Sequence, residues 1–175
     1  MDFSVLNPTV MVASVIVAAT PLLFAALGEL VVEKAGVLNL GVEGMMIVGA
    51  LAGFAATVES GSPWLGLVAA MAAGAALAAL FGLLTQFLMA NQVATGLALT
   101  MFGLGVAAML GQSYSGVAAP GFPRPDFGPL ADIPFFGRVL FGHDWLVYIC
   151  VGLTGAVGWF LGRTRAGLIL RAVGE

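Results

Sequence analysis

Charge is scarce in this sequence, and its scarcity excludes an ordinary soluble domain. Asp, Glu, Lys and Arg make up only 9% of the 175 residues, whereas a soluble domain carries about 25%. Hydrophobic residues account for 61% of the chain, and the mean hydropathy is +1.08. A chain of this composition has too little polar surface to coat a globule in water, so we expect its solvent to be a lipid bilayer.

Several functional motifs are also missing. The single cysteine, Cys150, cannot form an internal disulfide and is expected to be a small packing residue. The one histidine, His143, is expected to be a solvated loop side chain, and no metal-ligand spacing occurs. The six basic residues form no nucleic-acid-binding patch. Because there is no G-x-x-x-x-G-K-[ST] loop, we expect no enzyme and no bound cofactor, and any ATP must bind to a partner subunit.

Long apolar runs are what the chain has instead. They cover residues 9–28, 35–58, 64–90, 93–111 and 145–162. About 20 apolar residues cross a hydrocarbon core, and all but the last run reach roughly that length. The first run lacks the positive flank of a cleaved signal peptide, so it is expected to be a retained span. The predicted fold is therefore all-α, a polytopic transmembrane helical bundle with about five spans in a single domain over residues 1–175.

The loops set the expected orientation. Residues 29–34 are expected to separate the first two spans, and Lys34 lies among them. Three arginines within residues 163–171 follow the last span, and positive charge favours the cytoplasmic side. The connection 112–144 then faces outward. It holds five prolines, so it cannot be one continuous helix. Its short apolar piece, 133–140, can enter the interface but cannot span the bilayer.

Small residues recur four apart, which favours close helix packing in lipid. The pattern predicts a tight bundle and occurs at Gly49 and Gly53, at Ala70, Gly74 and Ala78, and at Gly158 and Gly162.

Two polar side chains interrupt the second apolar run. Asn39 and Glu43 are four apart, so a continuous helix would place both on one face. If that helix begins at Lys34, Glu43 lies near the middle of the bilayer, where a carboxylate must face protein or water. Three nearby glycines predict an irregular second span, and irregular backbone at membrane depth must be buried in protein or line a cavity.

Two uses of these polar groups remain open. They can line a translocation path or support its wall, as broken helices do in transporters. They can instead hydrogen-bond to a neighbouring helix or cap a helix break. A second polar group around the third and fourth spans can form hydrogen bonds between helices or a polar lining; it consists of Gln86, Asn91, Gln92, Thr95 and Thr100. We take Asn39, Glu43, Gln92 and Thr95 as the candidate substrate path or its support.

Three stretches of the chain resemble a known permease family. The run 28–46, GELVVEKAGVLNLGVEGMM, is similar to permease subunits of ABC importers for nucleosides and simple sugars. These subunits belong to the same broad group as the branched-chain amino acid and ribose permeases. The preceding run 20–27, TPLLFAAL, resembles the first conserved span of that family. The tail 164–175, TRAGLILRAVGE, resembles the start of the cytoplasmic segment that docks on the ATP-binding subunit.

The resemblance implies a transport function in the plasma membrane, the inner membrane of a bacterium. It implies a permease subunit for a nucleoside or simple sugar, with ATP on an ATP-binding partner, a second permease subunit and an extracytoplasmic substrate-binding protein. Residues 163–175 would begin the segment that couples to the ATPase. Its residues would be Thr164, Gly167, Arg171, Ala172, Gly174 and Glu175. Family permeases are longer, so the resemblance covers the N-terminal part of a family domain, whether in a truncated product, a fragment or a split subunit.

Two other functions fit the residues. An ion- or proton-coupled carrier or channel would use Glu43 as its coupling carboxylate. A non-transporting structural membrane subunit would keep every phenotype after Glu43→Gln.

Overall fold

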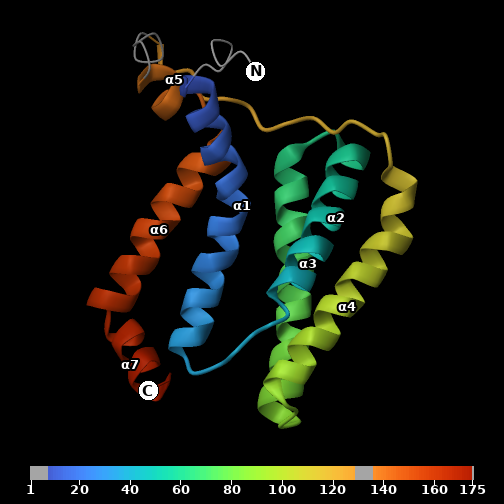
Figure 1. Cartoon of the computed structure of the whole chain (residues 1–175), viewed down its shortest axis with the longest axis vertical. Coiled ribbons are helices and arrows are strands. Elements are labelled where there is room, and N and C mark those ends of the chain that lie inside the picture. The colour runs from blue at the N-terminus through green and yellow to red at the C-terminus, as the bar shows by residue number, and fades with distance from the viewer. Residues whose placement is uncertain (1–7, 129–135, 175) are drawn as a thin grey trace, which may run out of the picture. The chain divides into compact units, whose positions relative to one another are not determined.

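The computed structural model describes residues 8–128 and 136–174, and every regular element in these residues is a helix (Figure 1). Within these described residues, five helical stretches are long and apolar enough to cross a membrane, which confirms the predicted all-α fold with about five spans. They are α1 (Pro8–Lys34), α2 (Val42–Ser60), α3 (Pro63–Gly82) with the π-helix η2 (Leu83–Phe87), α4 (Gln92–Leu110) with the 3₁₀ helix η3 (Gly111–Tyr114), and α6 (Trp145–Arg163).

Two shorter helices lie outside these spans. The first, α5 (Phe136–Phe141), falls within the predicted outer connection and overlaps the short apolar piece expected there. The first residues of that piece lie outside the described part of the chain. The second, α7 (Arg165–Gly174), follows α6 directly.

The chain divides into two compact units. The first contains Met1–Val31 and Phe122–Ala172, and the second contains Val32–Gly121 and Val173–Glu175. The second unit therefore holds α2, α3 and α4.

Glycines let the backbones of α2 and α3 approach closely in the second unit. A Cβ added to Gly53 would lie 3.0 Å from the Ala70 Cβ and 3.1 Å from the Gly66 carbonyl oxygen. One added to Gly49 would lie 3.3 Å from the Ala70 carbonyl oxygen. The small residues predicted to pack at these positions therefore do so.

Other members of the small-residue pattern do not make such contacts. A Cβ added to Gly74, Gly158 or Gly162 would meet no described atom of the chain within 4 Å. Spacing along a helix shows which small residues share a face, but it does not show which face meets a neighbour.

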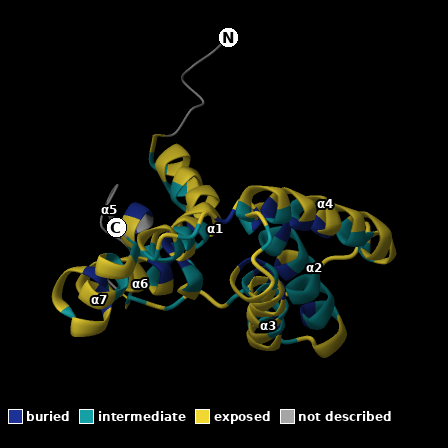
Figure 2. Ribbon diagram, turned by 90° about the horizontal axis from the view of Figure 1, so that it is seen from below, coloured by how far each residue is buried: buried dark blue, intermediate teal, exposed yellow. Residues whose placement is uncertain are grey.

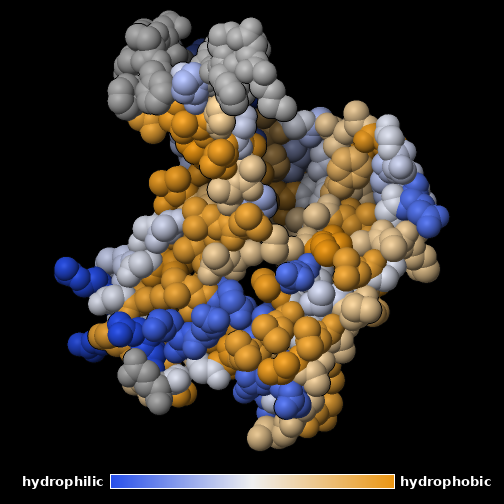
Figure 3. Space-filling view, viewed as in Figure 1, coloured by the Kyte–Doolittle hydropathy of each residue, from blue (hydrophilic) through white to orange (hydrophobic). Residues whose placement is uncertain are grey.

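The described side chains are exposed over most of the helix faces. Figure 2 shows exposed residues along much of α3 and α4, and apolar atoms dominate the visible helix surfaces (Figure 3). The core of the second unit is small and contains Leu77, Phe81 and Leu99. Most apolar side chains thus point outward, as expected of helices solvated by lipid.

In the first unit, buried side chains come from several helices, among them Thr20 and Leu27 of α1 and Val147, Cys150 and Leu161 of α6. Cys150 is 1% exposed, and its Sγ lies 3.7 Å from the Thr20 carbonyl oxygen, so it is the packing residue that was predicted. The expectation of a solvated His143 is wrong. This side chain is only 4% exposed, and its Nε2 lies 2.8 Å from the Val139 carbonyl oxygen. The helical turn of α5 supplies a backbone partner that the loop-like sequence does not reveal.

One predicted boundary is also wrong. Residues 29–34, expected to separate two spans, form the last turns of α1, and the next helix begins at Val42 rather than at Ala35. The polar residues Glu29, Glu33 and Lys34 are good helix formers and do not stop a helix. The stop is Gly36, whose φ is +78°.

Candidate functional site

A non-helical connecting segment, residues 35–41, joins α1 to α2. It begins with a Schellman motif, in which the Gly36 N–H donates to the Glu33 carbonyl at 2.9 Å and the Val37 N–H donates to the Val32 carbonyl at 3.2 Å. The left-handed backbone at Gly36 is one that glycine adopts without strain. The irregular second span is therefore confirmed, but the irregularity precedes α2 rather than interrupting it.

Asn39 is the buried polar residue of this segment. It is 7% exposed, and its Oδ1 accepts a hydrogen bond from the Gly41 N–H at 2.9 Å. Its Nδ2 donates to the Met45 Sδ at 3.7 Å. These contacts are those of a side chain that caps a helix break, which is one of the two alternatives that the sequence left open.

Glu43 lies in a different environment. It is in the first turn of α2 and is exposed. Since Asn39 precedes the helix, the two residues do not share a helical face, and Glu43 is not in the middle of a span. The expectation was wrong because it extended the helix back to Lys34. At its observed position the carboxylate complements the positive end of the helix dipole.

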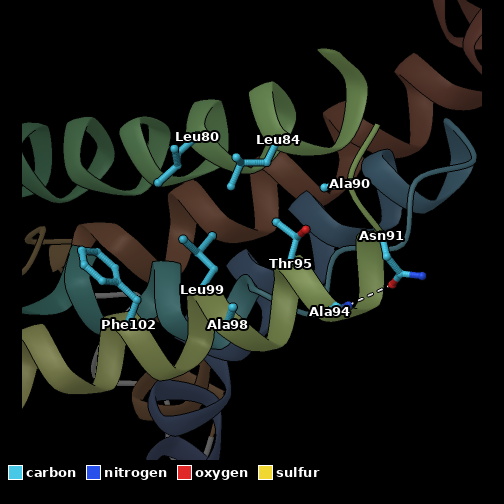
Figure 4. Close-up of a pocket in the computed structure, with 9 residues that line it drawn as sticks. All are labelled: Leu80, Leu84, Ala90, Asn91, Ala94, Thr95, Ala98, Leu99 and Phe102. Carbon is cyan, nitrogen blue, oxygen red and sulfur yellow. Dashed lines mark hydrogen bonds between the residues drawn. The ribbon is translucent and has the colours of Figure 1, made fainter. Parts of the chain in front are cut away.

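Gln92 and Thr95 are three residues apart in the first turn of α4 but have different surroundings. The Gln92 Oε1 accepts a hydrogen bond from the Leu38 N–H at 2.8 Å, so Gln92 contacts the connecting segment. Thr95 instead lines a pocket between α4 and the end of α3 (Figure 4). The structure therefore brings Gln92 and Asn39 to the same segment and places Thr95 elsewhere.

The pocket has a volume of about 480 Å³ and an almost wholly apolar wall. In Figure 4, Leu80 and Leu84 project from α3 and η2 toward Leu99 and Phe102 of α4. Its polar residues are Thr95 and Asn91, and the Asn91 Oδ1 caps α4 by accepting from the Ala94 N–H at 3.0 Å. A wall of this kind fits apolar groups better than the hydroxyl groups of a sugar. The volume of the pocket alone therefore does not identify it as a substrate path.

Thr100 belongs to the same polar group as Gln92 and Thr95 but was not among the candidate site residues. Its Oγ1 donates to the Leu40 carbonyl oxygen at 3.0 Å. The available signal was its spacing of eight residues from Gln92, which places both side chains on one face of a helix.

The predicted coupling segment forms a sharp corner. Thr164 lies between α6 and α7, where its Oγ1 accepts from the Gly167 N–H at 3.0 Å and donates to the Phe160 carbonyl at 2.7 Å. Thr164 is thus the N-cap of α7. Gly167 lies against the Phe160 carbonyl so closely that an added Cβ would overlap it. The two residues together explain why α7 turns directly out of α6.

Most of the exposed side chains of α7 are apolar. Leu168, Ile169 and Val173 are 50%, 64% and 79% exposed, and Ala172 is exposed beside them. Arg171 is half-buried.

The end of α7 belongs to the second unit. A Cβ added to Gly36 would lie 3.1 Å from the Gly174 Cα. Glu175 lies outside the described residues. Among the residues described, no group of three His, Cys, Asp or Glu side chains could hold a metal ion.

Five described helices that are long and apolar enough to cross a bilayer indicate a multi-pass membrane protein. The family described as branched-chain amino acid transport system / permease component matches residues 11–175. The chain belongs to this permease family, and it is a multi-pass protein of the plasma membrane.

Three curated relatives are similar along nearly the whole chain. TsgC13 of Haloferax volcanii, named as a candidate glucose ABC transporter permease protein, is 43% identical over 90% of this chain and 49% of its own length. The guanosine ABC transporter permease protein NupQ of Bacillus subtilis is 32% identical over 95% of this chain and 56% of its own length. The nucleoside ABC transporter permease protein NupC of Lactococcus lactis subsp. cremoris is 27% identical over the same shares. The chain thus spans about half the length of the curated relatives it matches, and no solved structure matches it.

Proposed function

We propose that this chain forms the N-terminal part of a permease domain in an ABC importer of the plasma membrane, and that its cargo is a nucleoside or simple sugar. The observation that carries the proposal is the family match over residues 11–175. Relatives named for glucose, guanosine and nucleoside transport support the substrate class. The partners in this proposal are an ATP-binding subunit, which holds the ATP, a second permease subunit and an extracytoplasmic substrate-binding protein.

The coupling role falls to residues 163–175. The exposed apolar side chains Leu168, Ile169 and Val173 give α7 a face that a protein groove can bury. Arg165 is exposed near the start of the same helix, where it can remain in water at the rim of the interface. ATP must bind one permease state better than another if it is to drive transport, and α7 is the element through which that difference would reach the membrane helices.

The substrate path in this proposal involves two parts of the second unit. Asn39, Glu43 and Gln92 lie at or beside the connecting segment, and Thr95 lines the pocket between α4 and the end of α3. Asn39 and Gln92 support the wall, since their polar atoms bond to backbone groups. Glu43 is the exposed group of this set. The connection 112–144 faces outward in this arrangement, toward the substrate-binding protein.

The experiment is uptake of radiolabelled nucleosides and sugars into cells that express the chain from its own locus, compared with cells that lack it. An ABC importer requires ATP and continues to work when an uncoupler removes the proton gradient while ATP is maintained. Uptake that collapses with the uncoupler at constant ATP would contradict the proposal and favour an ion-coupled carrier. Glu43→Gln then tests the carrier alternative further, since glutamine can neither bind and release a proton nor carry the negative charge that coupling through Glu43 requires.

A further inference from the structure

One face of α4, which we term the Gln92 face, consists of Gln92, Gly96, Thr100 and Gly103. These residues are spaced four, four and three apart, so the helix places them in one row. The connecting segment lies along this row. Two hydrogen bonds join them, from the Leu38 N–H to the Gln92 Oε1 at 2.8 Å and from the Thr100 Oγ1 to the Leu40 carbonyl at 3.0 Å.

The glycines of the Gln92 face allow this close approach. A Cβ added to Gly96 would lie 2.8 Å from the Leu40 nitrogen and 2.9 Å from the Gly41 nitrogen. Further along the row, a Cβ added to Gly103 would lie 2.7 Å from the Gly44 Cα. The Gln92 face therefore has room for a polypeptide backbone. The Gln92 side chain accepts a hydrogen bond from a backbone N–H group, and the Thr100 side chain donates one to a backbone carbonyl group.

The need for these bonds follows from the break in the helix. A helix satisfies its own backbone groups, but residues 38–41 are not helical, so their N–H and C=O groups need other hydrogen-bond partners. The partners come from residues 54 and 60 positions away in the sequence. Asn39 satisfies the Gly41 N–H within the segment itself. Gln92 and Thr100 thus act as hydrogen-bond partners for the backbone groups of Leu38 and Leu40, which lie outside the helices that flank the segment.

We propose that Gln92 and Thr100 are positioning residues for the substrate. They hold the connecting segment in register on α4, and through it they hold Asn39 and the first turn of α2 beside the path. The proposal rests on the proposed function. Neither residue contacts the substrate in this account. Each acts through one backbone hydrogen bond, and the two bonds lie on either side of Asn39 along the segment.

The first arm of the test is hydrogen–deuterium exchange of the purified full-length protein, read on peptides that cover residues 37–42. Thr100→Val removes the donor with little change of shape, Thr100→Ser keeps it, and Gln92→Leu removes the acceptor. Thr85→Val is the matched control, because the Thr85 hydroxyl donates to the Phe81 carbonyl of its own helical turn at 2.8 Å and not to the connecting segment. Loss of one net hydrogen bond should speed exchange about fivefold in Thr100→Val and Gln92→Leu. Unchanged exchange in both variants, or equal acceleration in Thr85→Val, would overturn the proposed bonds.

The second arm is the concentration dependence of uptake in cells that carry the same variants at equal membrane abundance. We expect Thr100→Val and Gln92→Leu to raise the KM for uptake about fivefold with little change in the maximal rate. Thr100→Ser should restore the wild-type KM. An unchanged KM in a variant whose exchange has accelerated would refute the positioning role while leaving the bonds intact. If the wild-type chain supports no uptake, the proposed function and the positioning role both fail, and the exchange arm still decides whether the bonds exist.

Discussion

Replacing Gly44 by alanine should destabilise the second unit, because α2 and α4 touch there through backbone. The added Cβ would lie 2.6 Å from the Leu99 carbonyl oxygen and 2.7 Å from the Thr100 Cα, whereas ordinary contact begins at 3.4 Å. No side-chain rotation can relieve these contacts, so the helices must separate by about 0.8 Å. Overpacking costs about 1–3 kcal/mol. The better helix propensity of alanine offsets up to about 1 kcal/mol of this cost. With an overpacking cost of about 2 kcal/mol, the middle of this range, a net loss of about 1–2 kcal/mol should follow.

Gly74→Ala is the matched control with the opposite expected sign. Gly74 is inside α3, and an added Cβ would meet no described atom within 4 Å. Only the propensity gain of about 1 kcal/mol then applies. The assay is thermal unfolding of the purified protein in detergent by far-UV circular dichroism. At about 2–4 °C per kcal/mol, Gly44→Ala should lower Tm by about 2–8 °C, and Gly74→Ala should raise it. Equal Tm changes in the two variants would refute the backbone contact between α2 and α4.

Three further predictions concern other positions. Cys150 is 1% exposed, so a fluorescent maleimide should label it slowly in mild detergent and rapidly after unfolding in SDS; rapid labelling in mild detergent would show that its environment is open. Gly36→Ala forces a non-glycine residue to a φ of +78°. This should cost about 1–2 kcal/mol of stability and lower Tm in the same unfolding assay. An unchanged Tm would show that α1 does not end at this glycine. Thr164→Val removes the N-cap of α7 and should cost about 1 kcal/mol, while Thr164→Ser should retain the wild-type Tm; equal values for the two variants would argue against the cap.

The spans could be predicted from the sequence because length and hydropathy are local properties. The apolar run expected to begin at Trp145 begins there as α6. The end of α1 was harder to predict. Glu33 and Lys34 suggested a loop, but the backbone at Gly36 decides where the helix ends. The sequence Lys34–Ala35–Gly36 does carry the glycine that a Schellman motif requires, and weighting it above charge would have placed the break correctly.

The site was only partly predictable. Asn39 could be selected from the sequence because it is a polar residue in an apolar run. The structure shows that its side chain is buried. Its partner along the segment, Gly41, is local. The bonds from Leu38 to Gln92 and from Leu40 to Thr100 are not, since they join residues 54 and 60 positions apart. A periodic pattern shows that Gln92 and Thr100 share a face, but only the tertiary fold shows that a backbone segment lies on it.

The central claim is that this chain works as part of an ABC importer, and affinity purification of the tagged chain from its native membranes in mild detergent tests it most directly. The account predicts that mass spectrometry will recover an ATP-binding subunit with the chain. It also predicts that Ile169→Ser combined with Val173→Ser, which removes exposed apolar surface from α7, will reduce this recovery, whereas Ala166→Ser on the same helix will not. Recovery of the intact wild-type chain without any ATP-binding subunit would contradict the account.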